Sequence, residues 1–180
     1  RVMRETEQRV TALLNDEIQI AQFIPPHLRQ RVEQSANYRI TPVDSVEIMF
    51  LAMQPKPPFD KKEVRQAVCH AMNPQDYIDA SLGGKGKIHT QRLREGFSGY
   101  SRDIKGYPFD LAKAKKLMAE LGNPKISFTL ASFDTQRTIA ELFRSQMAQI
   151  GIDVKIDLMT FGQFFSTFRS GKYPAAILTD

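Results

Sequence analysis

The stretch ISFTLASFDTQRTIAELFRSQMAQIGIDVKIDLM, residues 126–159, decides the fold of this chain. Residues 126–131 are mostly apolar and predict a strand. Residues 135–150 then repeat apolar side chains at helical spacing, until Gly151 ends the helix. Residues 152–159 alternate apolar and polar side chains, which is typical of a half-buried strand.

The alternation continues to the end of the chain, with a helix predicted over 161–169 and a strand over 173–180. Strands and helices that alternate in this way favour an α/β layered arrangement, in which helices pack against a sheet. Upstream, residues 46–53 predict a further strand. Because this strand is apolar almost throughout, we expect both of its faces to be buried.

Two aspartates stand where helices are expected to begin. Asp60 precedes a predicted helix over 61–72 and Asp110 precedes one over 111–121, so we expect each carboxylate to cap its helix. Residues 82–108 lie between these helices and show no persistent periodicity. Long irregular stretches inside domains are often functional or lie over a surface.

The rest of the chain carries shorter patterns. They predict helices over 1–14, from the Pro25-Pro26 pair to 34, and over 75–81, and short strands over 18–21 and 38–43. We expect the chain to be a piece of a longer protein, because neither an initiator Met nor a secretory leader opens it and a strand-like run closes it.

Composition excludes several classes of protein. The chain has 180 residues, 42% of them hydrophobic, which suffices for a domain with a real core. No apolar run reaches the roughly 18 residues that a membrane-spanning helix needs. Its net charge of +5 comes from scattered basic residues, a pattern that favours a solubilising surface over a nucleic-acid interface. One cysteine excludes an internal disulfide.

The sequence shows no grouping of residues that is typical of a catalytic or metal-binding site. The three histidines stand apart from one another, and we expect His70 to be an ordinary helix-surface or half-buried residue. Its neighbour Cys69 points about 100° away on the same helix, so a core thiol is favoured over a Cys–His dyad. We therefore expect no enzyme, no metal and no cofactor.

Two segments could contact a ligand. Phe161, Phe164, Phe165 and Phe168 have helical spacing, and a core stripe is favoured over a ligand groove. The polar turn 132–137 (Ser-Phe-Asp-Thr-Gln-Arg) joins a buried strand to a helix, and ligands of open α/β sheets bind beside such turns. A helix cap with surface charge explains this turn equally well.

Several motifs, taken together and in this order, resemble the peptide/nickel-type extracellular solute-binding proteins of ABC importers. The clearest is Pro57-Pro58-Phe59-Asp60 followed by Val64-Arg65-Gln66-Ala67. The others lie at 9–18, 71–73, 82–86, 107–122 and 139–152. The chain departs from the pattern of that family at four places: Asp16 replaces its Gly, Lys61 its second acid after Phe, and Asn73 its Asp. Met53-Gln54 stands where an Asn commonly precedes the Pro-Phe signature.

The resemblance implies an α/β fragment of a two-lobed periplasmic binding protein of type II, with a mixed sheet and flanking helices. Residues 1–45 would be the end of the first-lobe segment and the approach to the hinge. Residues 46–180 would be the second ligand-binding lobe, incomplete at its C-terminus. The implied protein is exported to the periplasm, monomeric, and binds no nucleic acid.

The implied function is to bind di- or oligopeptides, or similar small solutes, between two lobes and to deliver them to the permease of an ABC importer. The candidate ligand-binding residues are Ser132, Asp134, Gln136, Arg137 and Asp180. Asp134 would meet an amine of the ligand and Arg137 a carboxylate. The alternative is a solute-sensing module of a transcription regulator. The ligand itself, whether peptide, nickel chelate, haem, glutathione or sugar, is not determined by these residues.

Overall fold

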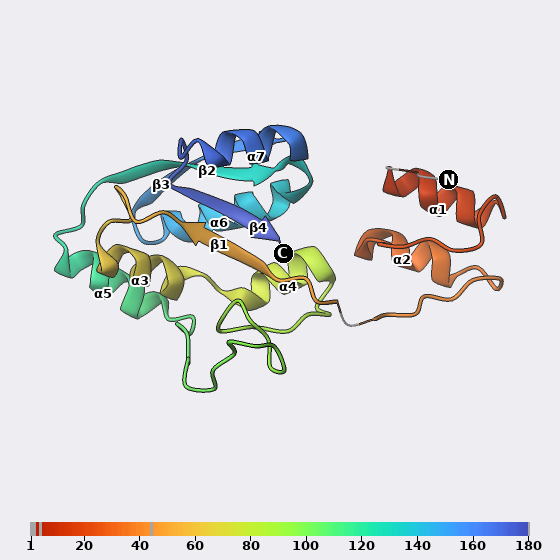
Figure 1. Cartoon of the computed structure of the whole chain (residues 1–180), viewed down its shortest axis with the longest axis horizontal. Helices are drawn as coiled ribbons and strands as arrows, with labels where there is room; N and C mark the ends of the chain where they lie inside the picture. The colour runs from red at the N-terminus through yellow and green to blue at the C-terminus, as the bar shows by residue number, and fades with distance from the viewer. Residues whose placement is uncertain (1–2, 4, 44, 180) are drawn as a thin grey trace.

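A mixed four-stranded sheet with helices on both faces makes up most of the computed structural model, which describes residues 3, 5–43 and 45–179 (Figure 1). The strands are β1 (Met49–Met53), β2 (Ile126–Phe133), β3 (Ile152–Met159) and β4 (Ala175–Thr179), in the spatial order β1-β4-β2-β3. The predicted α/β class, with a mixed sheet and flanking helices, is confirmed.

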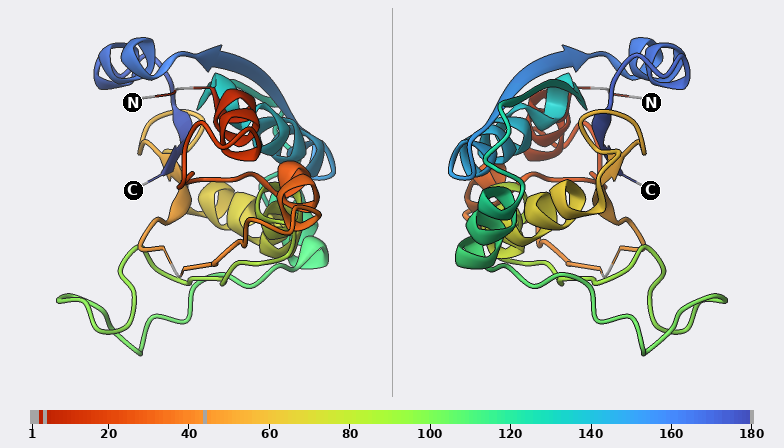
Figure 2. Two further views of the ribbon diagram at one scale, coloured as in Figure 1. Left: turned by 90° about the vertical axis from the view of Figure 1, so that its right-hand side faces the viewer. Right: turned by 90° about the vertical axis from the view of Figure 1, so that its left-hand side faces the viewer.

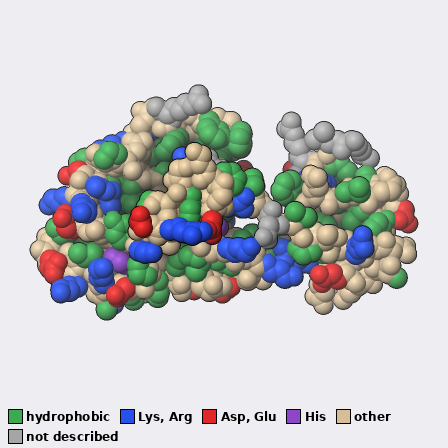
Figure 3. Space-filling model, turned by 60° about the horizontal axis from the view of Figure 1, so that its bottom comes forward, with side chains coloured by type: hydrophobic (Ala, Val, Ile, Leu, Met, Phe, Trp, Pro, Cys, Tyr) green, Lys and Arg blue, Asp and Glu red, His purple; other side chains and the backbone are tan. Residues whose placement is uncertain are grey.

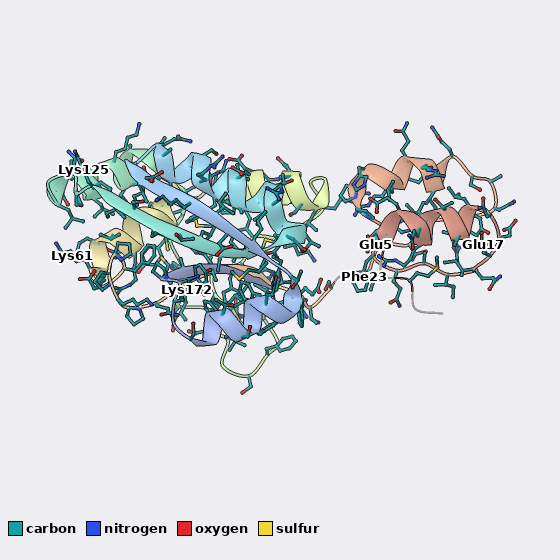
Figure 4. The ribbon with its side chains drawn as sticks, turned by 90° about the horizontal axis from the view of Figure 1, so that it is seen from above. Glu5, Glu17, Phe23, Lys61, Lys125 and Lys172 are labelled. Atoms are coloured by element: carbon teal, nitrogen blue, oxygen red, sulfur yellow. The ribbon has the colours of Figure 1, made fainter. Side chains whose placement is uncertain are left out.

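Strand direction brings several chain segments to one edge of the sheet. Strand β2 pairs in parallel with both β3 and β4, so the three strands end at the same edge, which we call the carboxyl edge. Strand β1 runs antiparallel to β4, with Met49 opposite Thr179, so it starts at this edge. In Figure 4, Lys125, just before β2, marks the opposite edge of the sheet.

The two faces of the sheet carry different helices, because side chains alternate along each strand. Leu130 and Ala175 belong to the large core beneath α3 (Lys62–Ala71), α5 (Leu111–Glu120) and α6 (Arg137–Ala148). Ala131 and Ala176 belong to a smaller core beneath α7 (Phe161–Arg169). Helices α6 and α7 lie on opposite sides of the strands in Figure 4.

Strand β1 is an edge strand, which corrects the prediction of two buried faces. It begins at Met49 rather than at residue 46, and its only neighbour among the described strands is β4. Met49 is 40% exposed and the rest of the strand is half-buried. An apolar run fits a central strand and an edge strand alike, since the run does not show how many neighbours will pair with it.

The prediction of two aspartate caps is half right. Asp110 caps α5, since its Oδ1 accepts the backbone N–H of Lys113 at 2.9 Å. Asp60 does not cap α3, which begins one residue later than predicted and has Lys61 at the N-cap position. The backbone oxygen of Asp60 instead accepts a hydrogen bond from Arg65 at 3.0 Å.

A pair of helices, α1 (Thr6–Leu14) and α2 (Pro26–Glu33), lies apart from the sheet (Figure 1). They enclose their own small core around Val10, Leu13 and Val32. The strands predicted over 18–21 and 38–43 are not formed. Ile18, Ala21, Tyr38 and Ile40 pack on this small core, whereas Ile20 and Val43 are exposed. No described strand runs beside these segments to accept their backbone hydrogen bonds. Figure 3 shows a notch between this pair and the main body.

Residues 83–110 contain neither helix nor strand, as predicted, and link α4 (Pro74–Leu82) to α5 (Figure 2). His70 anchors the end of this segment. Its Nδ1 donates to the Pro108 carbonyl at 2.7 Å, and its own carbonyl accepts the N–H of Asp110 at 2.8 Å. His70 is only 2% exposed, so the prediction of a surface or half-buried histidine is wrong. The carbonyl partner explains why its burial is tolerated.

Cys69, its neighbour, is half-buried rather than part of the core. Burial raises the pKa of its thiol, and the nearby Arg65 only partly offsets this effect. A raised pKa keeps the group a thiol at neutral pH, which agrees with the prediction that it is not a nucleophile.

A buried amide joins α4 to α6. The Gln146 side chain accepts a hydrogen bond from Tyr77 Oη at 2.7 Å and donates one to Asp76 Oδ2 at 2.8 Å. Asn73 donates to the other oxygen of Asp76 at 2.8 Å, and its side chain also caps α4 by accepting from the Gln75 N–H. The network satisfies polar groups that would otherwise be costly to bury.

Replacing Gln146 by Leu should lower the free energy of unfolding by about 2 kcal/mol, because Tyr77 and Asp76 then lose their buried partner. Urea unfolding of this chain measures the effect. The exposed Gln149→Leu is the matched control and should change stability by less than about 0.5 kcal/mol. Equal effects of the two changes would show that the network contributes little.

Stability should also fall in alkali because of Tyr77. Burial, with a smaller contribution from Asp76, raises the pKa of this phenol above its usual value. Below pH 10 the phenol is neutral in both states, so stability is unaffected. Above pH 10 it ionises in the unfolded chain first, which removes up to about 1.4 kcal/mol per pH unit. Tyr77→Phe should lack this part of the decline in urea titrations at pH 9 and 11. A decline as steep as that of the wild type would contradict the assignment.

Candidate ligand-binding site

The polar turn predicted from the sequence lies at the carboxyl edge of the sheet. Ser132 is the penultimate residue of β2, Asp134 and Gln136 bound the short 3₁₀ helix η1 (Asp134–Gln136), and Arg137 begins α6. The fifth predicted residue, Asp180, lies outside the described residues. The structure therefore brings four of the five predicted residues together on one turn.

Ser132 and Gln136 hold the turn in place. Ser132 is fully buried, and its hydroxyl donates to Gln136 Oε1 at 3.2 Å. The other end of the same amide, Nε2, donates to Thr179 Oγ1 on β4 at 3.0 Å. This chain of hydrogen bonds ties the turn after β2 to the last described residue of β4, so both residues act chiefly as positioning groups.

Asp134 and Arg137 are the exposed charges of the turn. Asp134 Oδ1 accepts the N–H of Thr135 at 2.7 Å, and no described residue donates to its second oxygen. No described residue accepts a hydrogen bond from the Arg137 guanidinium. One turn thus offers a carboxylate oxygen for a cationic group and a fork of N–H donors for an anionic group.

Chain direction adds a second reason to expect a ligand here. After β2 the chain passes to α6 on one face of the sheet, and after β3 it passes to α7 on the other. Where neighbouring parallel strands send the chain to opposite faces, their carboxyl ends diverge, and ligands of open α/β sheets bind at such points. The turn 132–137 and the start of α7 flank this divergence.

Aromatic residues beside the turn are less buried than the sequence predicts. Phe164 is fully buried and Phe168 half-buried, as a core stripe requires. Phe161 and Phe165, however, are 70% and 39% exposed. The prediction is thus right for one side of the helix only. The sequence does contain a signal for this exposure. Thr160 and Gln163 form the capping box that starts α7, so Phe161 lies in the first turn of the helix, at the carboxyl edge of the sheet.

Thr179 is the other residue that sequence reasoning missed. It lies in the last predicted strand, but only the parallel pairing of β2 with β4 brings it to Gln136.

The remaining chemistry is sparse. Over residues 3, 5–43 and 45–179, no three His, Cys, Asp or Glu side chains gather as a metal site. Among the helices of these same residues, none is long and apolar enough to cross a membrane. A shallow depression lined by Lys115, Asn123 and Gln149 opens near the amino ends of β2 and β3, away from the turn.

The chain matches a family of binding proteins over almost its whole length. Residues 1–179 match the family described as bacterial extracellular solute-binding proteins, family 5 Middle. Di/tripeptide-binding protein 1 of Pseudomonas aeruginosa is 33% identical over 129 residues, which cover 67% of this chain and 24% of that protein. The dipeptide-binding protein of Escherichia coli is 25% identical over 179 residues, which cover 94% of this chain and 34% of that protein.

A solved structure agrees with these matches. The periplasmic binding protein DppA of Helicobacter pylori, in complex with the peptide STSA, superposes with a TM-score of 0.87 at 27% identity. The match covers 100% of this chain and 36% of that protein. The chain spans about a quarter to a third of the length of its relatives.

The link between Gln136 and Thr179 can be measured by a double-mutant cycle. Gln136→Leu, Thr179→Val and the double variant should give a coupling free energy of about 1 kcal/mol in urea unfolding, because either change alone removes the hydrogen bond between the turn and β4. Additive effects of the two changes, with no coupling, would mean that the bond does not hold the turn.

Proposed function

Because this chain belongs to family 5 of the bacterial extracellular solute-binding proteins, we propose that it is part of a receptor that binds peptides or similar small solutes and delivers them to the permease of an ABC importer. The observation that carries the proposal is the pair of exposed charges, Asp134 and Arg137, on one turn at the carboxyl edge. A peptide carries the complementary pair, an amine and a carboxylate. The named relatives supply the ligand class: by name two of them bind dipeptides or tripeptides, and the structure of the third is a complex with a peptide.

In the proposed mechanism the ligand amine meets Asp134 and the ligand carboxylate meets the fork of Arg137. The hydrogen bonds of Ser132, Gln136 and Thr179 hold the turn in the conformation that presents both charges. Waters fill the remaining space around the ligand side chains, and closure of two lobes removes the charges from bulk solvent, which strengthens both contacts.

We assign residues 1–45 to the end of the first lobe and the approach to the hinge, and residues 46–180 to the second lobe. Two observations support this division. The core of α1 and α2 shares no residue with the cores of the sheet. The segment between α2 and β1 contains neither helix nor strand among its described residues, as a connection between lobes would.

The proposal includes the setting of the protein. The relatives are binding proteins by name, one of them periplasmic, so we place this protein in the periplasm as a non-catalytic binding protein. We propose in addition that it is a monomer and, from its scattered basic residues, that it binds no nucleic acid. The alternative, a sensor module of a transcription regulator, has no support from the relatives named above.

Charge reversal in the full-length protein tests the proposal. Asp134→Lys and Arg137→Glu should each weaken dipeptide binding by roughly 10- to 150-fold in titration calorimetry, the loss of one charge-assisted hydrogen bond. Lys125→Glu reverses an exposed charge at the opposite edge of the sheet and is the control (Figure 4). Unchanged dissociation constants for both reversals would refute the site, and a wild-type protein that binds no peptide would refute the function.

A further inference from the structure

Three phenylalanines form a cluster, the aromatic platform, at the carboxyl edge: the half-buried Phe133 and the exposed Phe161 and Phe165. The Phe133 and Phe161 rings are stacked, with centroids 5.7 Å apart and planes inclined by 15°. Phe165 meets Phe161 edge to face at 4.8 Å and lies 6.3 Å from Phe133. These spacings are those of interacting aromatic pairs, so the three rings form one continuous apolar surface.

The platform begins on the small core beneath α7, against which the half-buried Phe133 packs. Phe164, on the inner side of α7, is fully buried and supports Phe133 from below at 4.4 Å. Phe161 remains 70% exposed and Phe165 39% exposed. Large apolar side chains that gather at the surface, rimmed by polar residues, mark places where something binds.

The platform adjoins the charged turn through the backbone of β2. Ser132, Phe133 and Asp134 are consecutive, so Ser132 faces α6 while Phe133 faces α7. Phe161 opens α7 immediately after β3, the strand beside β2. The platform and the charged turn therefore border the same point, where the chain leaves β2 and β3 toward opposite faces.

We propose that the aromatic platform is a side-chain subsite, which binds an aromatic side chain of the peptide whose charged groups meet Asp134 and Arg137. This inference rests on the proposed function and adds a preference among its ligands. The platform is about three rings wide, which suits one side chain. An aromatic side chain stacks on it and buries apolar surface, whereas the methyl group of alanine covers little of it.

The subsite is tested in the full-length protein with three peptides: Ala-Phe, Phe-Ala and Ala-Ala. The wild type should bind the better of the two Phe peptides about tenfold more tightly than Ala-Ala. Phe161→Ala should abolish this preference and change the affinity for Ala-Ala by less than twofold. Because Phe161 is 70% exposed, its truncation leaves the core intact. Phe161→Tyr keeps the ring and should keep the preference.

Phe109→Ala is the matched control, since Phe109 is also exposed (47%) but precedes α5, which packs with α3 on the opposite face of the sheet from α7. It should leave all three affinities unchanged. If the wild type binds peptides without preferring Phe, or if Phe161→Ala keeps the preference, the subsite is refuted while the proposed function stands. If the wild type binds none of the three peptides, the subsite and the assignment of dipeptides as ligands of the proposed function are both refuted.

Discussion

Parallel pairing of β2 with both β3 and β4 is the constraint on which the candidate site depends. Because all three strands run the same way, the turn after β2, the start of α7 after β3 and Thr179 at the end of β4 meet at one edge. These segments are up to 47 residues apart in the chain, from Ser132 to Thr179. A different strand direction would separate Gln136 from Thr179 and Phe133 from Phe161.

The order of the strands then determines which residues lie on each face of the sheet at this edge. The chain goes from β2 through α6 to β3, and returns from β3 through α7 to β4 on the far side of β2. Right-handed crossovers in these two directions place their helices on opposite faces. One face therefore carries the charged turn at the start of α6, and the other carries the aromatic residues at the start of α7. A peptide has both kinds of group to offer.

Buried polar contacts, in addition to apolar packing, hold the helices behind the carboxyl edge. Gln146 ties α6 to Asp76 and Tyr77 of α4, and His70 ties the end of α3 to the segment before α5. Gln146 and His70 are nearly fully buried, and both have hydrogen-bond partners in place. Such contacts fix one arrangement of the helices, since any slip would leave a polar group unpaired. The start of α6, and Arg137 with it, is thereby held in position.

The sequence by itself determined the elements whose signals are local. Periodicity defined β3 and α7 to the residue, and the cap at Asp110 defined the start of α5, because neighbours along the chain suffice for these features. The turn 132–137 was found in the same way, from a strand that gives way to a helix. Tertiary structure alone decided that β1 is an edge strand, that Thr179 bonds to Gln136 of the turn and that Phe161 is exposed while Phe164 is buried. Each of these features depends on which other segments of the chain pack against the strand or helix concerned. A pattern of apolar residues shows that one face of an element needs a partner, but it does not show which of these residues the fold leaves exposed.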